Sequence, residues 1–229
     1  MVAWDAGVRT VECRIPDTAA QALLRSRLES GLGCPVCSSG RWGAGRGSAR
    51  SEGRPAQTVA FAQRLVAGDE YADIEGAIAK GDVPASVPRS GPDPVISWVS
   101  SGRELDSSMV ERVSTVTKEI GTSPGDVAVL CLTRRAVSIA TSALLRAGVP
   151  VMRLEEYDGS PVNAVKVGTI KRAKGLEFKQ VLIPDLGRAQ TALQPPASDT
   201  EHERWDLTRR ELYVAMTRAR DGLWVGINS

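Results

Sequence analysis

The sequence contains few of the side chains from which metal sites and disulfide frameworks are built. Its 229 residues include four cysteines and one histidine. Only Cys34 and Cys37 form a C-x-x-C pair, whereas a zinc ribbon needs two such pairs. The histidine, His202, lies far from this pair in the sequence. We therefore expect no metal site, and we interpret the pair as two reduced thiols.

The chain also lacks a strong charge imbalance and long apolar runs. Its formal net charge is only +2, so any nucleic-acid binding must come from local basic clusters and not from an overall field. No run of about 18 or more apolar residues occurs. The first residues, MVAWDAGVRT, lack the basic and then apolar pattern of a signal peptide. We expect a cytoplasmic protein without a membrane partner.

The beginning of the chain differs in composition from the remainder. Residues 38–55 read SSGRWGAGRGSARSEGRP, a stretch too rich in Gly, Ser and Arg to form a packed core. We expect residues 1–55 to be disordered or unrelated to the rest, as in a truncated or frame-disrupted gene. Residues 56–229 are expected to form one domain.

From residue 56 onward, strand-like and helix-like patterns alternate. Apolar runs typical of buried strands occur at 95–100, 127–132, 149–154, 164–170, 180–186 and 222–227. Helical patterns occupy 56–68, a stretch from a cap at Asp106 or Ser107 to Gly121, a stretch ending at Gly148, and 206–222. The polar GDEYAD at 68–73 is expected to be loop. The alternation predicts an α/β fold with a mainly parallel sheet and helices on both faces.

A basic turn follows the fourth of these strand patterns. In TIKRAKGLEF, from Thr169 to Phe178, the side chains of Lys171, Arg172 and Lys174 crowd like charges together. Such crowding is unfavourable unless an anion is near. Ligands of this fold class bind at the carboxyl ends of the strands, and the turn begins at one of them. A ligand site and a solvated turn remain equally open from these residues alone.

The last helical pattern carries arginines around an apolar core face. The apolar residues are Leu212, Val214, Ala215 and Met216, and the arginines are Arg209, Arg210, Arg218 and Arg220. Taken alone, this pattern favours a helix with a core face and a salt-bridged polar face over a binding site.

These segments resemble the motifs of UvrD/Rep/PcrA-type superfamily 1 helicases. VGTIKRAKGLEFKQVLIPDL is similar to their motif V, and RRELYVAMTRARDGLWV to their motif VI. DVAVLCLTRRAVSIATSALLRAGVPV is similar to the motif IV region. The resemblance covers about residues 56–229, and motifs V and VI in this order are highly specific. It implies the C-terminal, second RecA-like domain of a DNA helicase, with a role in DNA repair.

The resemblance also implies roles for single residues. In this family ATP lies between two RecA-like domains, and the second domain supplies groups across the cleft. Glu177 would contact the ATP ribose beside Gly175, and Arg218 would act as the arginine finger on the γ-phosphate. Single-stranded DNA would be contacted by Thr169, Lys171 and Arg172. The family usually has histidine where this chain has Lys171, so a phosphate contact is expected there rather than stacking on a base.

The departures from the family pattern concern the other half of the ATP site. The sequence contains neither the phosphate-loop motif G-x-x-x-x-G-K-[ST] nor an Asp-Glu pair after an apolar strand. ATP and Mg²⁺ are therefore expected only if a phosphate-loop domain is supplied in trans. Two functions remain open: the second motor domain of an ATP-dependent DNA helicase, inactive alone, or a non-catalytic remnant that binds nucleic acid or a partner.

Overall fold

The computed structural model describes residues 55–63, 65–66, 70–72, 78–80, 90–184, 186 and 198–228. The predictions for residues 1–54, including the Cys34 and Cys37 pair, lie outside the described residues. The domain boundary near residue 56 stays a prediction.

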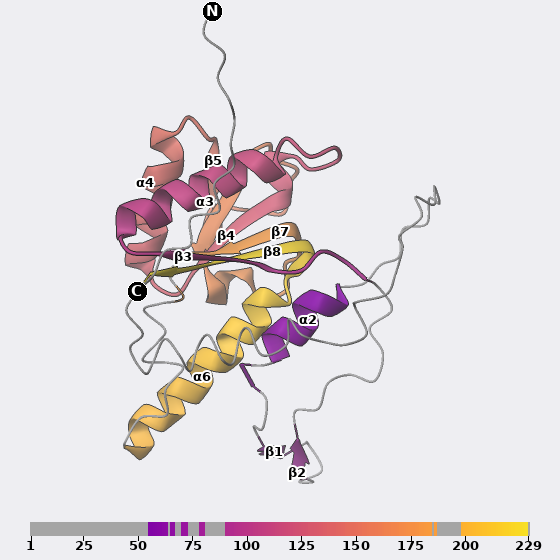
Figure 1. Cartoon of the computed structure of the whole chain (residues 1–229), viewed down its shortest axis with the longest axis vertical. Coiled ribbons are helices and arrows are strands. Elements are labelled where there is room, and N and C mark those ends of the chain that lie inside the picture. The colour runs from indigo at the N-terminus through magenta and orange to yellow at the C-terminus, as the bar shows by residue number, and fades with distance from the viewer. Residues whose placement is uncertain are drawn as a thin grey trace, which may run out of the picture.

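A six-stranded parallel sheet forms the centre of the molecule (Figure 1). Its strands are β3 (Val95–Val99), β4 (Val127–Cys131), β5 (Val151–Arg153), β6 (Val165–Thr169), β7 (Phe178–Ile183) and β8 (Ala219–Asn228). Their order is β3-β8-β7-β4-β6-β5, and every neighbouring pair is parallel. All six predicted strands are present, and the predicted α/β fold is confirmed.

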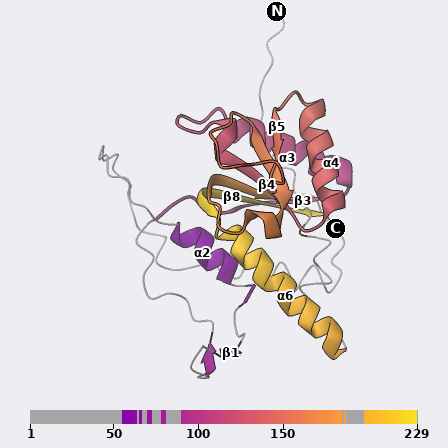
Figure 2. The same cartoon turned by 180° about the vertical axis from the view of Figure 1, so that it is seen from behind.

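Helices cover both faces of this sheet, as predicted. In Figure 1, α3 (Gly102–Val116) and α4 (Arg134–Arg146) lie above the sheet, and α2 (Ala56–Gln63) and α6 (Asp199–Met216) lie below it. Figure 2 gives the same layers from behind. Successive residues of a strand point to opposite faces. Accordingly, Val127 and Val129 pack with α3 and α4, whereas Ala128 and Leu130 pack with α2 and α6. Strand β4 is apolar throughout because each of its faces packs against a hydrophobic core.

The ends of α3 differ from those predicted. The helix begins at Gly102, where the side chain of Ser101 accepts a hydrogen bond from the Glu104 N–H at 3.3 Å. The Glu104 carboxylate in turn accepts from the Ser100 N–H at 2.8 Å. This pair of caps satisfies N–H groups that a helix start leaves open, so the predicted caps at Asp106 or Ser107 were wrong. The helix also ends at Val116, before the predicted stop at Gly121.

A second correction concerns the expected loop at residues 68–73. Residues Glu70–Ala72 form strand β1, which pairs antiparallel with β2 (Ile78–Lys80) in a separate two-stranded sheet. A strand of three residues is too short to produce a periodic pattern, so backbone pairing with a partner strand decided its structure.

The connection from β6 to β7 crosses one face of the sheet. Thr169 ends β6 opposite Cys131, the last residue of β4, whereas Gln180 of β7 lies opposite Val127, the first residue of β4. Residues 170–177, which begin with the 3-10 turn η2 (Ile170–Ala173), therefore run from the edge where strands end to the edge where strands begin. We call these the carboxyl edge and the amino edge, and residues 170–177 the crossover.

Candidate functional site

The crossover and the end of α6 lie side by side and are tied together at two points. Near the start of the crossover, the Lys171 ammonium lies 3.2 Å from the carboxylate of Glu211 on α6. At its end, the Phe178 N–H donates a 3.0 Å hydrogen bond to the Arg218 carbonyl. The same number of residues separates the two anchors on each segment. The two segments that resemble motifs V and VI therefore form one structural unit.

Arg218 lies just beyond the carboxyl end of α6. The helix ends at Met216, and the hydroxyl of the following Thr217 donates to the carbonyls of Tyr213 and Val214, both at 3.0 Å. The Arg218 Nε donates to the Val214 carbonyl at 3.1 Å. A cation at a helix carboxyl end is favoured by the helix dipole. The Arg218 side chain is half-buried, and its guanidinium has five N–H donors. It can therefore also donate hydrogen bonds to an anion at the amino edge.

Glu177 and Gly175 lie at the same edge as Arg218. Glu177 is exposed and precedes Phe178, which pairs with Ala219, the residue after Arg218. Glu177 and Arg218 thus lie close together in the backbone. A ligand of this fold class is expected at the carboxyl ends of the strands, but these two residues precede their strands and therefore lie at the amino edge. Gly175 has φ +85°, a backbone conformation that disfavours other residues.

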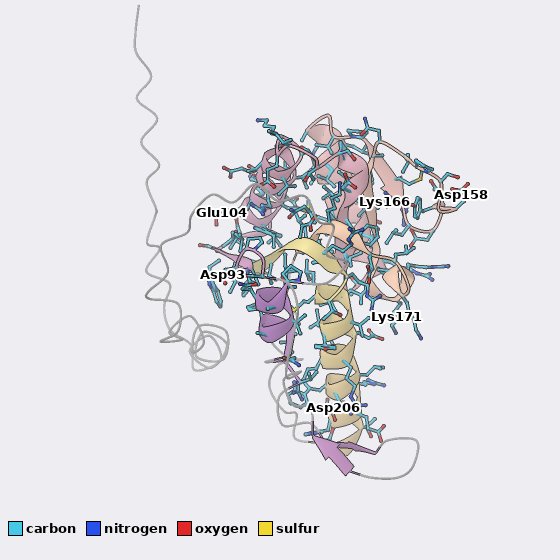
Figure 3. The ribbon with its side chains drawn as sticks, turned by 90° about the vertical axis from the view of Figure 1, so that its right-hand side faces the viewer. Asp93, Glu104, Asp158, Lys166, Lys171 and Asp206 are labelled. Atoms are coloured by element: carbon cyan, nitrogen blue, oxygen red, sulfur yellow. The ribbon has the colours of Figure 1, made fainter. Side chains whose placement is uncertain are left out.

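The three residues expected to contact DNA lie at the other end of the crossover. Thr169 is half-buried at the carboxyl end of β6, and Lys171 and Arg172 are exposed. Figure 3 shows Lys171 beside α6, nearer to the carboxyl end of the helix than Asp206. The predicted site residues therefore form two groups, one near each edge of the sheet, connected by the crossover.

The anion next to Lys171 was missed by the sequence analysis. The crowding of basic residues suggested an external anion, yet in the structure Lys171 pairs with Glu211. Lys171 and Glu211 are 40 positions apart in the sequence, so no local pattern indicated the contact. Because Glu211 already neutralises Lys171, the crowded basic residues do not by themselves require a bound anion.

The arginines of α6 have different environments. Arg209 is buried, with 3% of its surface exposed, and its Nε donates to the Leu65 carbonyl. Its guanidinium also lies 3.4 Å from the Asp206 carboxylate and 4.2 Å from the centre of the Trp205 ring. Arg209 therefore has a structural role, whereas Arg210 and Arg220 are exposed.

A second charged cluster lies near the amino edge, around the 3-10 turn η1 (Pro124–Asp126). Lys179 on β7 lies 3.1 Å from the Asp126 carboxylate, which also accepts from the Ser123 N–H and hydroxyl at 2.8 Å. Burial raises the pKa of Asp126, but these hydrogen bonds outweigh burial and hold the pKa below its usual value. Burial lowers the pKa of the neighbouring Lys166, which donates to the Gly125 carbonyl. These contacts fix the start of β4 to β6 and β7.

In the part of the chain that the structure describes, no group of three or more His, Cys, Asp or Glu side chains is arranged to hold a metal ion. None of the helices described is long and apolar enough to cross a membrane.

The fold and the comparisons identify the family. Six parallel strands with helices on both faces define an α/β domain of the RecA-like class. The family model of the UvrD-like helicase C-terminal domain matches residues 114–229, just over half of the chain. The chain therefore belongs to this family, and the resemblance seen in motifs V and VI is confirmed.

A solved structure supports the fold. The C-terminal domain of a possible DNA helicase from Lactobacillus plantarum WCFS1 matches with a TM-score of 0.53 and 16% sequence identity, over 78% of this chain and 88% of that one. At this identity the similarity supports the fold alone. Xpd4 of S. tokodaii matches with a TM-score of only 0.25 and 14% identity, over 62% of this chain and 35% of that one. No curated protein matches the chain.

Proposed function

We propose that this domain is the second motor domain of an ATP-dependent DNA helicase. At the amino edge, Arg218 acts as the arginine finger on the γ-phosphate, and Glu177 contacts the ribose beside Gly175. At the start of the crossover, Thr169, Lys171 and Arg172 contact single-stranded DNA. ATP and Mg²⁺ are held by a phosphate-loop domain, which acts as the partner of this one.

One observation carries the proposal. The segments similar to motifs V and VI are joined by the 3.0 Å hydrogen bond between the Phe178 N–H and the Arg218 carbonyl. Phe178 also pairs with Ala219. Glu177 and Arg218, the two residues proposed to contact ATP, directly precede this pair and therefore lie next to each other at the amino edge of the sheet. The exposed Glu177 carboxylate suits a ribose hydroxyl, and the half-buried Arg218 guanidinium suits a phosphate oxygen.

The chemistry assigned to Arg218 is charge stabilisation. As phosphoryl transfer proceeds, negative charge is spread over the transferring group, and a guanidinium beside it stabilises that charge. An arginine supplied from a second domain accelerates such reactions by roughly 10³–10⁵. The helix end that binds the Arg218 Nε orients this side chain before the nucleotide is bound.

The DNA contacts can be tested on the chain as it is. The three basic residues around this turn, Lys171, Arg172 and Lys174, neutralise only about two or three phosphates, so binding should be weak and should fall steeply with salt. The slope of log affinity against log salt should be near −0.7 per contact for a single strand. Lys171→Ala and Arg172→Ala should each lower the magnitude of this slope by about that amount.

Fluorescence anisotropy with a labelled oligo-dT at several salt concentrations measures these slopes. Lys118→Ala is the matched control, because Lys118 is exposed and follows α3, on the other face of the sheet. If the double variant Lys171→Ala and Arg172→Ala binds DNA as tightly as the wild type, DNA does not bind through this turn.

A second candidate function is a module that binds nucleic acid or a protein partner without ATPase activity. The absence of the phosphate-loop and Asp-Glu motifs from this sequence favours it. The two candidates differ when a phosphate-loop domain of the family is added in trans. Helicase function requires ATP turnover that falls with Arg218→Ala, whereas a binding module gives no turnover that depends on Arg218.

A further inference from the structure

The Lys171–Glu211 ion pair joins the proposed DNA contact to helix α6. The ammonium and carboxylate are 3.2 Å apart, and the Lys171 side chain is 72% exposed while that of Glu211 is 25% exposed. Lys171 can therefore be reached from solvent, but its charge is already matched by a carboxylate of the same chain.

Glu211 lies in the last two turns of α6, which ends at Met216, and Arg218 follows this end. Between Glu211 and Arg218 on the chain lies Val214, whose carbonyl accepts from the Arg218 Nε at 3.1 Å. The ion pair and the proposed arginine finger thus act on the same last turns of α6.

A carboxylate and a phosphate compete for one ammonium. If a phosphate binds Lys171 while Glu211 stays in place, two anions lie within a few ångströms of each other and repel. The lysine stem is flexible, so its ammonium can move from one anion to the other. Contact with DNA therefore weakens or breaks the Lys171–Glu211 pair.

We propose that Glu211 is a displaceable counterion for the DNA-contacting turn. Without DNA, Glu211 holds Lys171 against α6. When single-stranded DNA binds, a backbone phosphate takes Lys171 from Glu211 and loosens α6 from the crossover. This inference rests on the proposed DNA contact of Lys171. It makes Glu211 a positioning residue, which lowers DNA affinity and links DNA occupancy to the helix that ends at Arg218.

The first test compares two variants that remove the same charge from α6. Glu211→Gln removes the counterion of Lys171, and Glu203→Gln removes an exposed carboxylate earlier on the helix. Exposed ion pairs are weak, so Glu211→Gln should bind a fluorescein-labelled oligo-dT about two- to five-fold more tightly than Glu203→Gln. In a Lys171→Gln background this difference should disappear, because no ammonium remains to be released.

The outcomes separate this inference from the proposed function. A wild-type chain that does not bind oligo-dT, or that binds equally well with Lys171→Gln, overturns both the proposed DNA contact of Lys171 and the role of Glu211. If wild type binds through Lys171 but Glu211→Gln and Glu203→Gln bind equally, only the role of Glu211 is overturned. A gain that persists in the Lys171→Gln background overturns it as well.

A second measurement uses the unmodified protein and does not depend on the folding of a variant. On addition of saturating oligo-dT, amides in the last turns of α6 should exchange with deuterium up to about five-fold faster. In Glu211→Gln, whose melting temperature should change by less than about 4 °C, DNA should not alter this exchange. If DNA leaves the amide exchange of the wild-type protein unchanged or slows it, the proposed displacement of Glu211 from Lys171 is wrong.

Discussion

Arg209 and Arg210 are neighbours in the sequence but have opposite environments. Arg209 is buried and bonds the Leu65 carbonyl, while Arg210 is exposed. The difference follows from the helical period, which turns successive residues by about 100° and so directs one arginine toward α2 and the other toward solvent. The sequence marks both as arginines of a motif, but only their positions on the helix separate structure from surface.

Substitution of these two arginines should therefore have unequal effects. Arg209→Ala removes the donor to Leu65 and the partner of Asp206, and should lower the free energy of unfolding by about 2–3 kcal/mol. Arg210→Ala should change it by less than about 0.5 kcal/mol. Urea unfolding of both variants measures the difference, and equal effects would contradict a structural role for Arg209.

Gly175 offers a residue-scale test of backbone conformation. An added methyl group would meet nothing within 4 Å at either Gly175 or Gly102, but only Gly175 has a positive φ, of +85°. Gly175→Ala should therefore destabilise the fold by about 1–2 kcal/mol. Gly102→Ala should be neutral or stabilising by up to about 1 kcal/mol. Thermal unfolding of the two variants checks this, and a neutral Gly175→Ala would show that the turn adapts.

At the scale of elements, short turns decide how strands and helices meet. The crossover is held to α6 at both of its ends, and η1 is held to β7 through Asp126 and Lys179. Both connections use charged side chains at the surface, where single ion pairs contribute little to stability. Their main effect is to fix which segments lie side by side.

The η1 cluster predicts a dependence of stability on pH. The pKa of Asp126 is lowered in the folded state, so its ionised form contributes stability at neutral pH. This contribution is lost as the pH falls through the folded pKa. Asp126→Asn should therefore cost about 0.5–1 kcal/mol at about pH 7, and the gap to wild type should narrow below about pH 4. Urea midpoints across this range measure the gap, and a constant gap would contradict the role of the carboxylate.

At the scale of the whole molecule, we propose that this sheet carries half of a two-domain ATP site. Arg218 and Glu177 come together at the amino edge, but the sequence contains no phosphate-loop motif to hold the phosphates they would contact. An arginine finger stabilises charge only on a phosphoryl group that another element positions.

The purified chain alone should therefore show no DNA-stimulated ATP hydrolysis. A coupled assay with oligo-dT, compared with the same assay on Arg218→Ala, makes the measurement. Turnover by the wild-type chain that disappears in the variant would mean that these residues bind and hydrolyse ATP without a partner domain.

The sequence by itself determined the fold class and the order of its elements. Apolar runs such as 127–132 are local signals, because a strand buried on both faces must be apolar at every position. The motif segments likewise placed Glu177 and Arg218 each directly beside a strand, β7 and β8 respectively. For such features, the cause lies within a few residues of the effect.

Only the tertiary structure decided which edge of the sheet each group occupies and which partners the charges have. The pairing of Lys171 with Glu211, the burial of Arg209 against Leu65, and the strand pairing of Glu70–Ala72 all join segments distant in sequence. Charged side chains and three-residue strands carry no periodic signal of their own. Their structure depends on what the rest of the chain brings beside them, and that is fixed only when the sheet and its helices have packed.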